Sequence, residues 1–190
     1  MKKTLTVLMM VLLAAMLIVS CDSKPKKTWP TYEVGDTGPA GGLIFYVNPN
    51  ADADGWKYLE AGKSDLGGDE ALYKWGPNDD VTIGTKTDIG EGKNNTGLVA
   101  AKGSGYEAAN AVSGDLYGNG FKDWFLPSKD ELNLMYENLK KAGLGSFTSF
   151  PYWSSSEDGS TEAWRQDFGN SLQTSASRDN KSHVRPVRMF

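Results

Sequence analysis

The chain has 190 residues, with 20 lysine and arginine residues against 24 aspartate and glutamate residues, and its formal net charge is −4. Nucleic acid is not expected as a partner, because the body of the sequence has no stripe of clustered cations for binding phosphates. Cys21 is the only cysteine, which excludes an internal disulfide and a cysteine-rich metal site. Abundant glycine and aromatic residues, with few long aliphatic runs, favour short strands and many turns over a helical bundle.

The N-terminal residues are typical of an exported lipoprotein. Two lysines precede an uncharged, mostly apolar run over residues 5–19, which is shorter than the roughly 20 residues that a membrane-spanning helix needs. Residues 18–21, with the sequence Ile-Val-Ser-Cys, resemble a lipobox. We therefore expect residues 1–20 to be a signal peptide and Cys21 to carry acyl chains such as palmitate that hold the protein at a membrane. The alternative is an uncleaved anchor, or a signal peptide whose cysteine is incidental.

After the signal peptide, the sequence divides into a tether and one domain. Residues 21–31 are polar and rich in proline and lysine, which predicts a tether that begins at the lipidated cysteine. Residues 32–190 are long enough to form a single domain with its own core. The expected location is the cell envelope, either at the outer membrane and cell surface or facing the periplasm. The oligomeric state stays open.

Strand signals lie at both ends of the domain. Residues 41–47 are apolar and rich in β-formers, and residues 56–61 follow a turn at Asp54 and Gly55, so the two segments predict an N-terminal β-hairpin. Toward the C-terminus, short strand-like pieces flank residues 169–181, which are polar and nearly free of apolar side chains. This polar tract predicts a loop or an exposed sheet edge.

Two helices are expected between these strands. Small apolar residues over residues 94–112 suggest one helix, interrupted by glycines at residues 103–105. Ser128 and Glu131 have the spacing of a capping box, and the apolar residues that follow lie on one helical face. The second helix therefore begins after Ser128, and Gly143 is placed to end it.

Three strings then stand out, at residues 123–132, 152–157 and 184–188, with the sequences DWFLPSKDEL, YWSSSE and VRPVR. In this order and spacing they resemble the C-terminal domain family of Legionella collagen-like protein, and residues 35–47 and 89–96 are similar to its earlier motifs. The family is related to the formylglycine-generating-enzyme branch of the C-type-lectin fold. The resemblance implies an α+β, C-type-lectin-like domain with two helices and short mixed antiparallel strands. The resemblance does not imply that this protein generates formylglycine, because that reaction uses cysteines that the domain lacks.

A calcium-loop-like pattern lies in the early hairpin. Asn50, Asp52 and Asp54 space their oxygen atoms like the start of an EF-hand loop. The bidentate acid would fall at Ala61, whereas the sequence has Glu60. A solvated turn is therefore preferred to a metal site, and no cofactor is expected.

No catalytic set is evident, so the protein is not expected to be an enzyme. His183 is the only histidine, which excludes a histidine-based zinc cluster, and the serines of residues 154–156 lack a nucleophile-elbow sequence. A carboxylate-based glycan-processing enzyme that uses Asp52, Asp54 or Glu60 stays open as a rival. The charged residues within the family motifs are interpreted as structural ion pairs; they are Asp123, Glu131, Glu157, Arg185 and Arg188.

The polar tract is the expected ligand site. An aromatic platform at Trp164, followed by short polar side chains, suits recognition of a host or envelope glycan or protein. Its place before the final motif also resembles the variable region of diversity-generating-retroelement proteins, over residues 166–182. A merely solvated loop, in a structural envelope lipoprotein without a soluble ligand, is the alternative. The candidate ligand-binding residues are Trp164, Gln166, Asn170, Ser171, Gln173, Ser175, Arg178 and Asn180.

Overall fold

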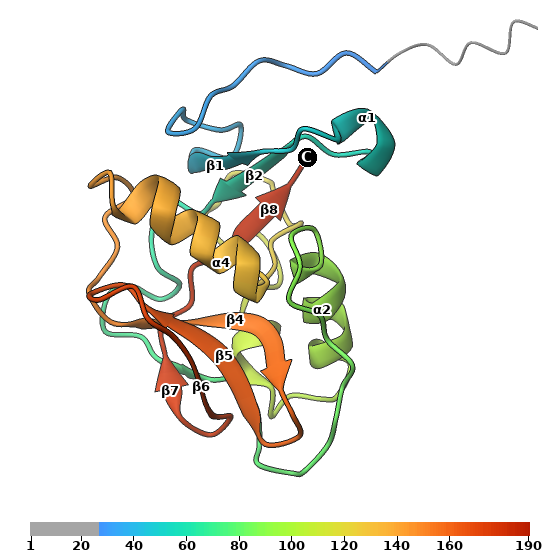
Figure 1. Ribbon diagram of the computed structural model, residues 1–190, viewed down its shortest axis with the longest axis vertical. Helices are drawn as coiled ribbons and strands as arrows, with labels where there is room; N and C mark the ends of the chain where they lie inside the picture. Colours follow the sequence, from blue (N-terminus) through green and yellow to red (C-terminus); the bar gives the residue numbers. More distant parts are fainter. Residues whose placement is uncertain (1–26) are drawn as a thin grey trace, which may run out of the picture.

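The protein, described from a computed structural model, is built around three small sheets. Residues 27–190 are described, so the expected signal peptide and Cys21 lie outside the described residues. The sheets have the strand orders β1-β2-β8, β3-β7 and β4-β5-β6, and every strand pair in them is antiparallel. Helices pack between and beside them (Figure 1). The expected α+β fold class is confirmed.

Most of the elements are short. The strands are β1 (Leu43–Val47), β2 (Tyr58–Ala61), β3 (Tyr73–Lys74), β4 (Pro151–Asp158), β5 (Glu162–Asp167), β6 (Gln173–Ser177), β7 (Lys181–Ser182) and β8 (Val187–Met189). The helices are α1 (Ala51–Asp54), α2 (Gly92–Ala100), α3 (Glu107–Ala111), α4 (Lys129–Met135) and the π-helix η1 (Tyr136–Lys140).

The predicted N-terminal hairpin is present. Val47 pairs with Tyr58 and Leu43 with Ala61, and β8 then adds to the other edge of β2. The connection between the two strands contains the four-residue helix α1, which ends where Gly55 adopts a φ of 79°. The calcium-loop-like segment therefore folds as a single helical turn.

The predicted interrupted helix is divided into α2 and α3. Gly103 lies between them with a φ of 123°, a conformation that a residue with a side chain rarely adopts. The first of the two begins earlier than expected, at Gly92. A Cβ atom at this position would lie only 2.2 Å from Glu131 Oε2, so a glycine is needed for the helix to approach that buried carboxylate.

The second predicted helix has the capping box that its sequence indicates. Ser128 Oγ accepts the Glu131 N–H at 3.2 Å, and Glu131 Oε2 accepts the Ser128 N–H at 2.7 Å. This reciprocal pair satisfies two N–H groups that the first helical turn leaves without partners. The helix continues into η1, and Gly143 follows with a φ of 72°.

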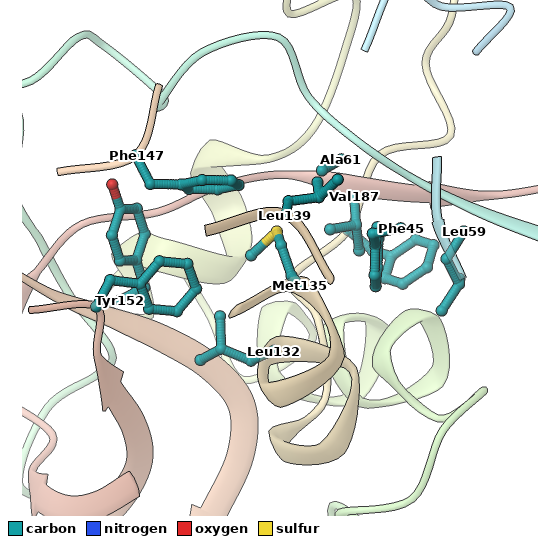
Figure 2. Packing of buried hydrophobic residues seen from close by; sticks show 11 residues of the cluster. Phe45, Leu59, Ala61, Leu132, Met135, Leu139, Phe147, Tyr152 and Val187 are labelled. Carbon is teal, nitrogen blue, oxygen red and sulfur yellow. The ribbon is translucent and has the colours of Figure 1, made fainter. Parts of the chain in front are cut away.

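The main core lies where α4 and η1 pack between two sheets. Figure 2 shows Leu132, Met135 and Leu139 beside residues from the β1-β2-β8 sheet and from the start of β4. All of these side chains are buried, and this apolar burial is the principal source of stability. The labelled partners are Phe45, Leu59, Ala61, Phe147, Tyr152 and Val187.

The polar tract forms a sheet edge, as expected. Its first part becomes β6, the outer strand of the β4-β5-β6 sheet, and its end becomes β7. Side chains alternate between the two faces of a strand, so Trp164 and Arg165 of β5 point to opposite faces. The two faces have different surroundings.

The last residues of the expected tether contact the domain. Tyr58 donates its hydroxyl to the Pro30 carbonyl at 2.7 Å, and the Trp29 indole N–H donates to Asp52 Oδ1 at 3.2 Å. Residues 27–40 and the C-terminus lie at the end of the molecule that holds the β1-β2-β8 sheet, whereas the β4-β5-β6 sheet lies at the other end (Figure 1). Within residues 27–190, no helix has the length and apolar character required to cross a bilayer.

Candidate ligand-binding face

One face of the β5-β6 ladder collects half of the predicted ligand residues. Glu162, Trp164 and Gln166 of β5 pair with Ser177, Ser175 and Gln173 of β6, so their side chains lie on the same face, which we call the polar face. Lys129, the first residue of α4, places its Nζ atom 3.4 Å from the centroid of the half-buried Trp164 ring. The polar face therefore combines an aromatic ring and a cation with short polar groups.

Hydrogen bonds hold the side chains of the polar face in place. Gln173 Nε2 donates to the Lys129 carbonyl at 2.9 Å, and Ser175 Oγ donates to Glu162 Oε2 at 2.7 Å. Gln166 Nε2 donates to Asn133 Oδ1 at 2.9 Å. Because Gln166 is fully buried, its predicted contact with a ligand is wrong, and it instead joins the sheet to α4.

The other predicted ligand residues lie at the two ends of β6. Asn170 and Ser171 form the β5-β6 turn, where Asn170 Oδ1 accepts the Leu172 N–H at 3.0 Å and Ser171 has a φ of 72°. Asn180 lies exposed in the β6-β7 turn, where its N–H donates to the Ser177 carbonyl at 3.0 Å. The structure thus places Asn170 and Ser171 at one end of the strand and Asn180 at the other.

Arg178 does not face a ligand, which corrects the prediction made for it. Its side chain is fully buried, Nη2 donates to Glu157 Oε2 at 2.8 Å, and Nη1 donates to the Val81 carbonyl at 2.8 Å. The guanidinium carbon also lies 4.7 Å from the centroid of the buried Trp75 ring. Arg178 is a structural residue that fastens the loop containing Val81 to the C-terminal sheet.

The expected ion pairs of Arg185 and Arg188 are present. Arg188 contacts Asp123 at 2.9 Å and Glu60 at 3.2 Å. Burial raises the pKa of Asp123, but the hydrogen bond and charge of Arg188 oppose this effect and hold the pKa below its usual value. Arg185 contacts Asp65 at 2.6 Å, a buried partner that no sequence motif indicated.

Glu131 differs from the other motif acids, and its predicted ion pair is wrong. No cation lies within ion-pair distance in the part of the chain that the structure describes, and its carboxylate accepts the N–H groups of Ser128 at 2.7 Å and Gly90 at 2.8 Å. Burial raises the pKa of Glu131 to about 7, and these hydrogen bonds only partly offset that rise. Its role is to cap α4 and hold the loop before α2.

The remaining candidates have structural contacts. Asp54 Oδ2 accepts Asn48 Nδ2 at 2.9 Å, Asn50 precedes α1, and Glu60 accepts the Ala40 and Gly42 N–H groups at 3.0 and 2.8 Å. Within residues 27–190, no group of three or more histidine, cysteine, aspartate or glutamate side chains is arranged to hold a metal ion. The hydroxyls of Ser154, Ser155 and Ser156 donate to the backbone carbonyls of Trp164, Pro127 and Lys86.

Together these features define an α+β domain whose buried charges serve the scaffold and whose polar face lies on the outer strands of a small sheet. The Lcl C-terminal domain matches residues 75–188, and the chain belongs to this family. The match includes the polar face and all four arginines of the chain, and it confirms the resemblance seen in the motifs. A comparison with curated proteins finds no match.

Proposed function

We propose that this protein is an envelope lipoprotein that presents a non-enzymatic, adhesin-like binding domain, and that its ligand contacts the polar face. The observation that carries the proposal is the half-buried Trp164 ring beneath Lys129, beside polar side chains held by hydrogen bonds. Rigid aromatic groups next to fixed polar groups give binding area at a small cost in conformational entropy.

The position of the polar face suits a protein held at its N-terminus. Acylation of Cys21 would fix the chain to a membrane a few residues before Lys27. Trp29 and Pro30 contact the end of the domain opposite to the β4-β5-β6 sheet (Figure 1). An anchored domain can thus turn the polar face away from the lipid surface.

The chemistry of the polar face indicates the kind of ligand. A flat, weakly polar group, such as the apolar face of a sugar ring, can pack against the exposed part of the half-buried Trp164 ring, beside Lys129. Its hydroxyl groups can donate to the Ser175 and Ser177 oxygens, whose own hydrogens are donated to Glu162 and Asp179, and an acidic substituent can pair with Lys129. A glycan or a polar protein loop has these groups, and we propose one of the two as the ligand.

Non-enzymatic binding is preferred to glycan hydrolysis because the acids available for it are engaged in the fold. Glu60 is fully buried and contacts Arg188, and Asp54 accepts a hydrogen bond from Asn48. A glycosidase needs two carboxylates that face one cleft with room for the sugar. Glu60 does not meet that condition.

The binding proposal can be tested with glycan arrays and cell-binding assays on the mature protein. We expect wild-type binding and at least a ~10-fold loss in Trp164→Ala, since stacking on an aromatic ring contributes on the order of 1–3 kcal/mol. Thr174→Ala is the matched control, because Thr174 is exposed on the opposite face of β6. Absence of binding by wild type, or equal binding by Trp164→Ala, would contradict the proposal and favour a structural lipoprotein.

The anchor needs a separate experiment. Cells that express the chain should incorporate labelled palmitate into the wild type, and Cys21→Ala should abolish the labelling. Protease added to intact cells then distinguishes the two locations, because a surface domain is degraded and a periplasmic one is protected. Labelling that survives Cys21→Ala would contradict the proposed lipid site.

A further inference from the structure

A second surface feature lies on the opposite side of β5 from the polar face. It is a cavity of about 430 Å³ that forms where the β3-β7 ladder meets the start of β4. Its volume is within the range of small-molecule sites, roughly 300–1,000 Å³. The residues that matter for its chemistry are Glu70, Leu72, Phe150, Arg165, Lys181 and His183.

The apolar wall of the cavity is unusually exposed. Phe150 is 62% exposed and Leu72 is 44% exposed, and both precede a strand that frames the cavity. The Phe150 ring stacks on the His183 ring with a centroid distance of 5.9 Å and an interplanar angle of 24°. Large apolar side chains that gather at the rim of a cavity mark a surface that a ligand can cover.

Arg165 supplies the charge, and it differs from the other three arginines. Arg178, Arg185 and Arg188 each contact a carboxylate, whereas Arg165 has none within 4.0 Å in the described part of the chain. Its Nη1 makes one long hydrogen bond to Ser182 Oγ, at 3.4 Å, and its buried Nε has no partner.

Lys181 and His183 line the same cavity. Lys181 is exposed and has no carboxylate within ion-pair distance among residues 27–190. The His183 side chain is 4% exposed, and its Nδ1 atom, 4.0 Å from Asp65 Oδ2, makes no hydrogen bond. Of the cations in the cavity, Arg165 is half-buried and has no acid partner among residues 27–190, which is costly, so an anion that enters the cavity would relieve that cost.

We propose that this cavity binds a small ligand in which one carboxylate is joined to an aromatic or branched aliphatic group. The carboxylate lies against Arg165 and Lys181, in the bidentate geometry that a guanidinium favours. The apolar group covers Phe150 and Leu72. Glu70 also lines the cavity, and its charge disfavours a second acidic group, so ligands with a single negative charge are selected.

Calorimetric titration of the mature protein with N-acetyl-L-phenylalanine tests the proposal, with the corresponding amide as the uncharged probe. We expect the acid to bind at least ~10-fold more tightly than the amide, and Arg165→Met to remove that preference, since only the carboxylate can form charge-assisted hydrogen bonds with the guanidinium. Equal binding of the two probes, no binding of the acid at millimolar concentration, or an unchanged preference in Arg165→Met would overturn it.

The apolar wall is tested by Phe150→Ala, which removes an exposed ring and leaves the core intact. We expect the affinity for N-acetyl-L-phenylalanine to fall about 5-fold or more, since the ring contributes apolar contact area. Leu172→Ala is the matched control, because Leu172 is 59% exposed but lies in the β5-β6 turn. Equal losses of affinity in Phe150→Ala and Leu172→Ala would contradict the proposal that the ligand binds in the cavity.

The source of the carboxylate is distinguished with a pentapeptide that ends in phenylalanine, used as free acid and as C-terminal amide. Binding of the free acid as tight as that of N-acetyl-L-phenylalanine assigns the site to a chain end, and weaker binding assigns it to a small free acid. Trp164→Ala should leave all of these affinities unchanged. The proposal for the cavity can therefore be contradicted while the proposal for the polar face is supported, or the reverse.

Discussion

The environments of Arg185 and Arg165 differ although both side chains belong to the same C-terminal half of the fold. Arg185 is buried, contacts Asp65 at 2.6 Å and donates to the Gly62 and Gly145 carbonyls. Arg165 is half-buried, has no carboxylate partner in residues 27–190 and lines a cavity. A guanidinium nitrogen without a hydrogen bond does not by itself distinguish the two arginines, since both Arg165 Nε and Arg185 Nη2 lack a partner.

The two environments separate charges that stabilise the fold from charges that a ligand can use. A buried cation is tolerated when an acid and backbone carbonyls replace its water, and such a residue links distant parts of the chain. A cation that has no carboxylate partner and lies beside exposed apolar side chains can offer its charge to a ligand. Glu131 is intermediate, because only N–H dipoles offset the burial of its carboxylate.

The largest effect is expected from breaking the Arg185 pair. In Arg185→Met, the buried Asp65 carboxylate keeps only the hydrogen bond from the Tyr152 hydroxyl, and the nearby His183 Nδ1 makes no hydrogen bond. The variant should therefore lower the free energy of unfolding by about 3–5 kcal/mol. Urea denaturation measures the change, and Arg185→Met combined with Asp65→Asn should recover part of the loss.

An exposed ion pair serves as the control for that variant. Lys141 and Glu137 form an i,i+4 pair at 2.7 Å on the helix surface, and Lys141→Met should lower the free energy of unfolding far less than Arg185→Met, because water screens the exposed pair. If Arg185→Met costs no more than Lys141→Met, then burial of the pair does not matter, and the distinction between the two kinds of arginine is lost.

Sequence predicts the local parts of this fold well, because their interactions span a few residues. The capping box needs only Ser128 and Glu131, three positions apart, and the hairpin needs two short segments on either side of a turn. Asp65 could not be predicted as the partner of Arg185, because 120 residues separate them and no motif surrounds the acid.

The candidate site was predicted only in part, for a related reason. Polar composition identified the edge strand and the polar face, but it did not distinguish an exposed side chain such as Asn180 from a buried one such as Arg178. The cavity was missed entirely. It forms from residues 70, 72, 150–151, 165 and 181–183, which the fold brings together and no local pattern marks.

The buried carboxyl group of Glu131 predicts that the stability of the protein depends on pH. Burial raises the pKa of Glu131 from 4.5 to about 7, so the folded protein holds a proton there that the unfolded chain has already lost. Stability from this group is therefore complete below about pH 4.5 and falls as the pH rises through about 7, by up to about 3 kcal/mol.

Glu131→Gln isolates that contribution. The amide can still accept the Ser128 N–H as part of the capping box, but it does not titrate. The difference in unfolding free energy between wild type and Glu131→Gln should therefore change steadily from pH 5 to pH 8, whereas exposed Glu137→Gln should give a nearly constant difference. A constant difference for both variants would show that Glu131 is ionised at pH 5 in the folded protein.

The smallest effect on stability is expected at Arg165. Arg165→Met leaves no buried acid unpaired and keeps an unbranched apolar side chain, and the contact that it removes is a distant one, since the guanidinium carbon lies 5.8 Å from the centroid of the Trp153 ring. We therefore expect the free energy of unfolding to change by less than about 1 kcal/mol, and a small gain is consistent with removing a partly buried charge that has no partner. The same urea titrations measure it. A loss as large as that of Arg185→Met would mean that Arg165 is a scaffold arginine like the other three, and the charge that the cavity offers to a carboxylate would then already be in use by the fold.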